Sequence, residues 1–144
     1  MSTLPFTEKE LRKAWKDLKD ASKTNSGKRK NPHRLLLFYA VECGLKAVWL
    51  RSNNKNVLDT KNIDEYKHNL HKLIHELNLG KDYLLPNDIK LKSCTIENKS
   101  FPRNGKFDVL HQAWRYGGCC VAPSDEQCEK QLQKIAEWID KEIS

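Results

Sequence analysis

The sequence predicts an all-α fold: a five-helix bundle in one domain spanning residues 1–144, with an irregular insertion at 81–106 before the fourth helix. Two observations predict it. Capping boxes, in which side chains satisfy backbone N–H groups at a helix start, occur near both ends of the chain. Between them, the stretch from Leu35 to Leu50 is apolar on nearly every side of a helix. Such a helix must be covered by others, as in a bundle.

The first two helices have clear starts. Thr7 and Glu10 form the first capping box. The apolar stripe that follows consists of Leu11, Ala14, Trp15, Leu18 and Ala21. Pro32 occupies the first turn of the second helix, where proline is favoured, and this helix is expected to be the central one. Glu42 and Lys46 interrupt its apolar surface, four residues apart in the order that favours an ion pair.

The third helix is expected from about residue 63 to 79, ending at Gly80. Its buried face consists of Tyr66, Leu70, Leu73, Ile74 and Leu77. His68, His71 and His75 fall on the opposite face. Histidines four residues apart are a metal-ligand spacing, but no acidic or cysteine ligand is fixed beside them, so we expect no metal. We expect His68 to order the helix start or line a shared cleft, and the other two to be solvated or to face a partner.

The last third of the chain is less regular at first. Three pairs break the 81–106 segment: Pro86-Asn87, Phe101-Pro102 and Asn104-Gly105. A short strand or hairpin is one alternative for this insertion. The fourth helix covers 107–116 and ends at two glycines. Ser124 and Gln127 form the second capping box and open the last helix. The seam of that helix consists of Cys128, Leu132, Ile135, Ile139 and Ile143.

Composition narrows the setting. Lys and Arg number 26 against 19 Asp and Glu, a net charge of +7. This balance suits nucleic acid, a nucleotide or an acidic protein face, and it equally suits plain solubility. Five cysteines with two adjacent and no CxxC pair do not form a disulfide framework. The polar start excludes a signal peptide, and the longest apolar run, 35–41, is too short to span a bilayer. We expect a cytoplasmic protein without membrane contact.

Three signals in order point to a family. An apolar helix carries Glu42 and Lys46 in AVECGLKAVWL, the next helix opens with His68 in HNLHKLIHEL, and a short helix then ends in Arg115-Tyr116 before a final amphipathic helix. This order resembles the HEPN superfamily, small helical-bundle domains of prokaryotic nucleotidyltransferase partners, toxins and antiviral defence proteins. The resemblance covers about residues 33–78 and 107–143. It implies a homodimer or a subunit of a larger complex, in a defence or toxin–antitoxin setting.

Many HEPN domains are metal-independent ribonucleases, whose signature is an arginine followed after four to six residues by a histidine. Arg115 falls where that arginine would be, but residues 120–122 fill the histidine slot with Cys, Val and Ala, and no histidine follows. The spacing from Arg103 to His111 leaves seven residues between them and spans a predicted loop-to-helix junction. The resemblance therefore implies the fold and a binding role, without the nuclease signature.

We expect a binding or regulatory subunit that recognises an anionic ligand, RNA or a nucleotide, or a partner protein. Arg115 and Tyr116 are the expected contacts, made through charge-assisted hydrogen bonds. His68, Lys46 and Glu42 are the expected cleft residues, with His111 as a further candidate. No cofactor and no metal are expected.

Structural readings of the same residues stay open. In one of them, Arg115 caps the fourth helix and pairs with Glu42. In another, Glu42 and Lys46 form a structural network. Trp114 is expected in the core, and Cys119 with Cys120 are expected to be packing residues rather than reactive thiols.

Two further functions stay open. His111 and Arg115 are four residues apart on one helix face, which would place a proton carrier beside a phosphate clamp. A ribonuclease with this rearranged His/Arg pair is the enzyme alternative. A purely structural subunit that docks on a larger ATPase or nuclease is the other. The sequence leaves catalysis undecided and favours binding, because the signature histidine is missing.

Overall fold

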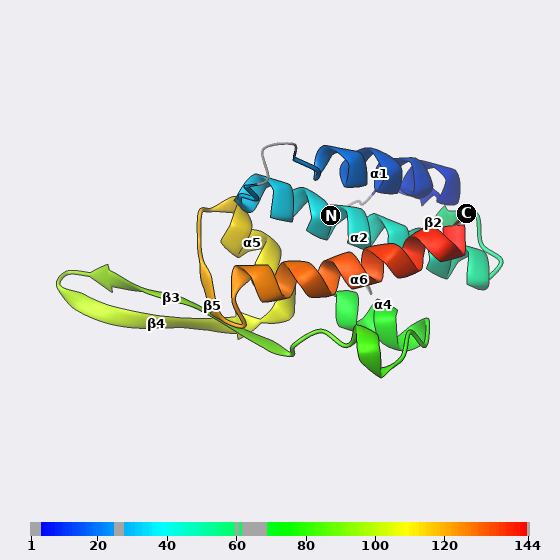
Figure 1. The fold of residues 1–144 in the computed structure, drawn as a ribbon. Coiled ribbons are helices and arrows are strands. Elements are labelled where there is room, and N and C mark those ends of the chain that lie inside the picture. The colour runs from blue at the N-terminus through cyan, green and yellow to red at the C-terminus, as the bar shows by residue number, and fades with distance from the viewer. Residues whose placement is uncertain (1–3, 25–27, 60, 62–68, 144) are drawn as a thin grey trace.

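The computed structural model describes residues 4–24, 28–59, 61 and 69–143. Its helices are α1 (Glu8–Ala21), α2 (Asn31–Ser52), α4 (Leu70–Glu76), α5 (Leu110–Arg115) and α6 (Asp125–Ile143). Two small antiparallel sheets accompany them (Figure 1). The predicted all-α helical bundle is therefore wrong, and the fold is mixed α and β.

The helix starts follow the local signals. The amide of Glu10 donates to Oγ1 of Thr7 at 3.1 Å, and the amide of Thr7 donates to Oε1 of Glu10 at 3.0 Å. Ser124 and Gln127 make the same reciprocal pair at 3.2 and 2.9 Å before α6. Pro32 lies in the first turn of α2. Both capping boxes and the start of the second helix are confirmed.

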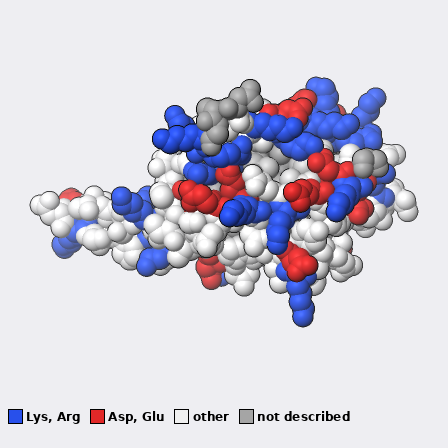
Figure 2. All heavy atoms as spheres, viewed as in Figure 1, with Lys and Arg blue, Asp and Glu red and all other residues white. Residues whose placement is uncertain are grey.

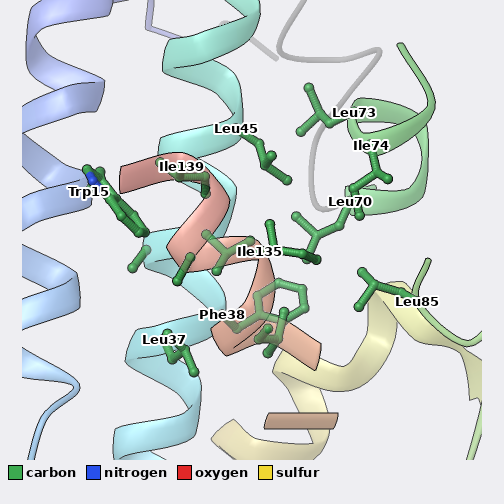
Figure 3. Packing of buried hydrophobic residues seen from close by; sticks show 14 of the residues in the cluster. Trp15, Leu37, Phe38, Leu45, Leu70, Leu73, Ile74, Leu85, Ile135 and Ile139 are labelled. Atoms are coloured by element: carbon green, nitrogen blue, oxygen red, sulfur yellow. The ribbon is translucent and has the colours of Figure 1, made fainter. Parts of the chain in front are cut away.

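The core surrounds α2, which contacts α1, α4, α5 and α6. Phe38 and Leu45 of α2 are fully buried, as is Ile139 of α6. Figure 3 shows Trp15 of α1 meeting Ile139 on one side of α2, while Leu70 of α4 lies on the other. The central position predicted for the second helix is confirmed.

Gly44 lets three helices approach closely. A methyl group at this position would lie 2.8 Å from Cγ2 of Ile139 and 3.0 Å from Cε3 of Trp15, inside normal van der Waals contact. Because α1 and α6 both press on α2 here, the absence of a side chain at Gly44 sets the spacing of the helical layer.

We expect Gly44→Ala to lower the free energy of unfolding by about 1 kcal/mol net, measured by urea unfolding. Overpacking costs about 1–3 kcal/mol, and the better helix propensity of alanine returns about 1 kcal/mol. Adding Ile139→Val should reduce the overpacking, because valine lacks the Cδ1 atom that would lie 2.9 Å from the new methyl. A single variant as stable as the wild type would contradict this packing.

The first sheet pairs β1 (Phe6–Thr7) with β2 (Val57–Leu58), and the amide of Glu8 extends this pairing to the carbonyl of Asn56. The second sheet has the order β4-β3-β5. Its strands are β3 (Asp88–Ile96), β4 (Lys99–Lys106) and β5 (Cys120–Ala122). Strand β5 pairs only with Lys90 and Leu91, and the part of the hairpin beyond them projects from the helices (Figure 1). We call the whole hairpin, residues 88–106, the arm.

The arm corrects the prediction of an irregular insertion at 81–106, and it confirms the hairpin that was the alternative for this segment. Glu97 and Asn98 both have positive φ, 51° and 65°, and form a two-residue hairpin loop between β3 and β4. Positive φ at both positions is the geometry of the tight turns that match strand twist. Glutamate is not a usual residue for that geometry, so the turn carries only a weak sequence signal.

The residues that suggested chain breaks are accommodated within the arm. Pro102 lies where the register shifts between the pairs Leu91–Arg103 and Cys94–Phe101. The extra residue falls on β3, so β4 runs past this bulge regularly, and proline is tolerated at such a position on an edge strand. Gly105 lies within β4, where a methyl group would come 2.7 Å from Cγ2 of Val109.

The predicted bounds of the fourth helix agree with the structure better than those of the third. Helix α4 ends at Glu76, before the predicted end, and Asn78 and Gly80 take positive φ values of 55° and 97° before a short 3-10 turn at Lys81–Tyr83. The predicted start of this helix, with Tyr66 and His68, lies outside the described residues. The fourth helix is confirmed as a 3-10 turn at Phe107–Val109 that continues into α5. None of the helices in the described ranges has the length and apolar character needed to cross a membrane.

Candidate anion-binding site

The exposed end of α5 presents a guanidinium between two aromatic rings. Nη2 of Arg115 donates a hydrogen bond to the hydroxyl of Tyr39 on α2. Its Cζ lies 6.0 Å from the ring centroids of both Tyr39 and Tyr116. Hydrogen bonding to Tyr39 and then to Tyr116 raises the pKa of Arg115. This side of α5 therefore holds a permanent positive charge at the surface, oriented by the helix it packs on.

Tyr116 is the most exposed large hydrophobic residue in the described part of the chain, at 77%. It lines a hollow of about 240 Å³ between α5 and the root of the arm. The polar lining comes from Arg103, Asn104 and Gln112, and the apolar lining comes from Leu91, Val109 and Ala113. The hollow is smaller than the roughly 300–1,000 Å³ of drug-sized sites, so it suits a small group such as one base.

Two glycines close this end of α5. Gly117 has φ +78°, and the amide of Gly118 donates to the carbonyl of Ala113 at 2.6 Å. A methyl group on Gly118 would lie 3.0 Å from that carbonyl oxygen and 3.1 Å from Cδ2 of Leu91. The glycines let the chain turn tightly under the helix and continue into β5, which leaves Tyr116 standing beside the hollow.

His111 lies on the Arg115 side of α5 but faces the core. The four-residue spacing places both residues on one face of α5, as predicted, and this face is turned toward α2. The ring of His111 is 5.5 Å from that of Phe38 and 6.2 Å from that of Tyr39, and the residue is only 6% exposed. A general base must reach the proton it removes, and this imidazole is covered by aromatic rings. In the structure, the ring of His111 packs beneath Tyr39 and supports its position.

Glu42 and Lys46 form the predicted ion pair, with Nζ of Lys46 2.9 Å from Oε2 of Glu42. Their side chains are 12% and 9% exposed. Tyr39 lies one turn earlier on the same stripe of α2. Arg115 interacts with Tyr39 and Tyr116. The ion pair thus neutralises itself below the surface, and Arg115 carries the charge that a ligand would meet.

A buried polar network fixes α5 in place. Nε1 of Trp114 donates to Oδ1 of Asp125 at 2.8 Å, and the amide of Cys120 donates to the same oxygen at 3.1 Å. Arg34 lies 3.9 Å from Asp125 and 3.3 Å from Glu129. Trp114 is 2% exposed, so its predicted core position is confirmed. Because Arg115 follows Trp114 directly, this network also limits where the guanidinium can lie.

Sequence reasoning missed three residues of this site. Tyr39 was counted as one more apolar residue of the central helix, although a tyrosine hydroxyl at a helix surface usually finds a partner. Arg103 was assigned to a broken loop, and Gln112 carried no motif. The partner of Tyr39 is Arg115, 76 positions along the chain, and Nε and Nη2 of Arg103 donate to the carbonyl oxygen of Lys92 across the hairpin at 3.0 and 2.6 Å. Helical spacing identifies neither contact.

Within the predicted histidine stripe, His71 does not lie on an open face. Nε2 of His71 lies 3.1 and 2.9 Å from the carbonyl oxygens of Leu85 and Pro86, and its ring packs edge-on against Phe107 at 5.5 Å. The chain after α4 returns over His71, which corrects its assignment to solvent or a partner. His75 is exposed, and His68 lies outside the described residues. Within residues 4–24, 28–59, 61 and 69–143, no three His, Cys, Asp or Glu side chains are grouped to hold a metal ion.

Three of the five cysteines lack the setting of reactive thiols. All five are free of disulfides. Burial, followed by the charge of Glu42, raises the pKa of Cys43 to about 11. Desolvation and the nearby Asp125 raise the pKa of the exposed Cys119, and a hydrogen bond with Cys128 raises that of Cys120. Thiolate chemistry at these three positions is therefore disfavoured at neutral pH.

No protein-family model matches the chain, and comparisons with curated proteins and with solved structures also find no match. The resemblance to HEPN domains consequently stays a prediction that rests on the quoted residues.

Proposed function

We propose that this protein is a binding or regulatory subunit that recognises an anionic ligand, RNA or a nucleotide, at the surface formed by Arg115, Tyr116 and the adjoining hollow. The observation that carries the proposal is the exposed guanidinium of Arg115, held by the Tyr39 hydroxyl beside the ring of Tyr116. Fixed cations next to exposed aromatic rings suit phosphate and base together.

Recognition would need no covalent step. Arg115 donates charge-assisted hydrogen bonds to phosphate oxygens, and its planar fork suits two of them at once. Tyr116 offers a face on which a base stacks. Gln112 of α5 lines the hollow and supplies an amide group for a base edge. Tyr39 positions Arg115 and does not itself contact the ligand.

The cellular setting belongs to the same proposal. The prokaryotic defence or toxin–antitoxin role, as a homodimer or a subunit of a larger complex, comes from the HEPN resemblance alone, whereas the cytoplasmic location is expected from the cysteine usage. The ribonuclease alternative with His111 and Arg115 is less favoured, because His111 packs between Phe38 and Tyr39 at 6% exposure.

The test is equilibrium binding of fluorescein-labelled RNA dinucleotides and octanucleotides, followed by anisotropy. Arg115→Gln should weaken binding roughly ten-fold or more, since a charged hydrogen bond contributes about 1.5–3 kcal/mol. Arg115→Lys should retain part of the affinity, because it keeps the charge and loses the fork. Lys16→Gln removes one positive charge from the exposed side of α1 and should bind like the wild type.

Three results would contradict the proposal. Wild-type protein that binds neither RNA would exclude the ligand class, and unchanged affinity of Arg115→Gln would exclude the site. RNA cleavage that disappears in both Arg115→Ala and His111→Ala would replace binding by the ribonuclease alternative.

A further inference from the structure

One face of the arm carries an aromatic ring with cations on both sides of it along β4. Side chains alternate between the two faces of a strand, so Lys99, Phe101 and Arg103 share one face. The bulge adds its extra residue to β3, so this alternation continues unbroken along β4. Opposite them on β3, Ile96 pairs with Lys99 and Cys94 pairs with Phe101. We call this surface, Cys94, Ile96, Lys99, Phe101 and Arg103, the aromatic face.

The aromatic face runs into the hollow beside Tyr116. Arg103 lines that hollow together with Tyr116, and Gly105 follows on the same face of β4. A strand rises about 3.3 Å per residue, so Phe101 lies roughly 13 Å along the strand from Gly105. The order along the surface is therefore Tyr116, Arg103, Phe101 and Lys99: each aromatic ring is followed by a cation.

The apolar side chains of the aromatic face are open to solvent. Phe101 is 43% exposed and Ile96 is 54% exposed, on a ribbon that projects from the helices (Figure 1). Large apolar side chains left exposed together indicate a surface that binds something.

The charge of the arm indicates the chemistry of its occupant. Residues 89–105 contain four basic side chains, Lys90, Lys92, Lys99 and Arg103, against the single acid Glu97 at the turn. Figure 2 shows the blue of Lys and Arg along the arm. Two copies of such an arm repel each other, and the centres of protein interfaces are depleted of lysine. Rings alternating with cations instead match a polyanion with exposed base faces.

We propose that the aromatic face binds single-stranded nucleic acid, with bases stacked on Tyr116 and Phe101 and phosphates paired with Arg103 and Lys99. This inference rests on the proposed function and extends it from one nucleotide to a strand that follows the arm. A duplex does not fit this surface, because its bases are already stacked on each other and hide their faces.

The experiment compares labelled single-stranded RNA and DNA octanucleotides of one sequence, the corresponding dinucleotides and a duplex, by anisotropy at several salt concentrations. The octanucleotides should bind more tightly than the dinucleotides and the duplex. Phe101→Ala should weaken octanucleotide binding roughly ten-fold and leave dinucleotide binding unchanged, as expected for one lost stack. The ratio of RNA to DNA affinity then shows whether the 2′-hydroxyl is read.

Charge-matched variants locate the strand on one face. Lys99→Ala should reduce the slope of log affinity against log salt by about 0.7, the value for one phosphate contact on a single strand. Lys90→Ala removes the same charge from the opposite face, where Lys90 is exposed and pairs across to Asn104, and should change the slope far less.

The outcomes separate this inference from the proposed function. Equal affinities for both lengths, or unchanged octanucleotide binding by Phe101→Ala, would overturn the strand surface, while the effect of Arg115→Gln on the dinucleotide would still support the proposed function. Loss of all binding in the wild type would overturn both. A Phe101→Ala variant that changes only the oligomeric mass in native mass spectrometry would instead make the arm a contact between copies.

Discussion

Asp125→Ala is expected to lower the free energy of unfolding by about 3–5 kcal/mol. The carboxylate is 7% exposed and accepts hydrogen bonds from Nε1 of Trp114 and the amide of Cys120. Alanine would leave both donors buried without an acceptor and would remove a negative charge beside Arg34. Removing one partner of a buried, hydrogen-bonded charge pair typically costs this much.

Urea unfolding monitored by tryptophan fluorescence measures this loss, and Glu126→Ala is the matched control. Glu126 lies 3.5 Å from the same Arg34, but its side chain is 73% exposed, so its removal should cost less than about 1 kcal/mol. Equal losses in the two variants would show that the Asp125 network does not hold α5 against α6.

Phe38→Ala is expected to cost about 3–5 kcal/mol of stability, the range for removing a fully buried phenylalanine. Phe38 has no exposed surface, and its ring lies 5.5 Å from His111 and 6.1 Å from Tyr39. The cavity would open beneath the residue that positions Arg115. Ligand affinity should therefore fall as well, even where the variant is kept folded at low temperature.

Phe101→Ala provides the control for the loss of stability, because it removes the same kind of side chain from the exposed arm. Its effect on the unfolding free energy should stay within about 0.5 kcal/mol. Calorimetry of the two variants side by side makes the comparison. Similar melting temperatures for both would mean that the arm is packed against the body or that Phe38 is not in the core.

Local features of the fold were predictable from the sequence. The two capping boxes, the Pro32 start and the Glu42–Lys46 pair each depend on residues no more than four apart. The central position of α2 followed from its apolar surface, which has to be covered. The burial of Trp114 followed from its helical spacing, because aromatic residues so placed usually lie in the core.

The arm was not predictable in the same way. Its hairpin depends on a turn at Glu97 and Asn98 and on cross-strand pairing that tolerates Pro102 at a bulge. Composition marks both positions as breaks, so an all-α bundle was the natural but wrong prediction. The strand pairing becomes visible only when the two sides of the hairpin are placed together.

The candidate site was half predictable. Arg115 and Tyr116 stood out because a basic and an aromatic residue precede two glycines, and the structure places both at the surface. Glu42 and Lys46 were expected in the same cleft, but their mutual ion pair is nearly buried. The contact between Tyr39 and Arg115 joins residues 76 positions apart, and such distances are beyond the reach of helical periodicity.

The most direct test is a nuclear magnetic resonance titration of the ¹⁵N-labelled protein with a single-stranded RNA octanucleotide. Shifted amide signals should cluster in two segments, residues 99–105 of the arm and 112–118 around Arg115, and the side-chain Nε–H signal of Arg115 should shift with them. Shifts confined to the basic surface of α1, at Lys9, Lys13 and Lys16, or no shifts at all, would contradict binding at Arg115 and along the arm.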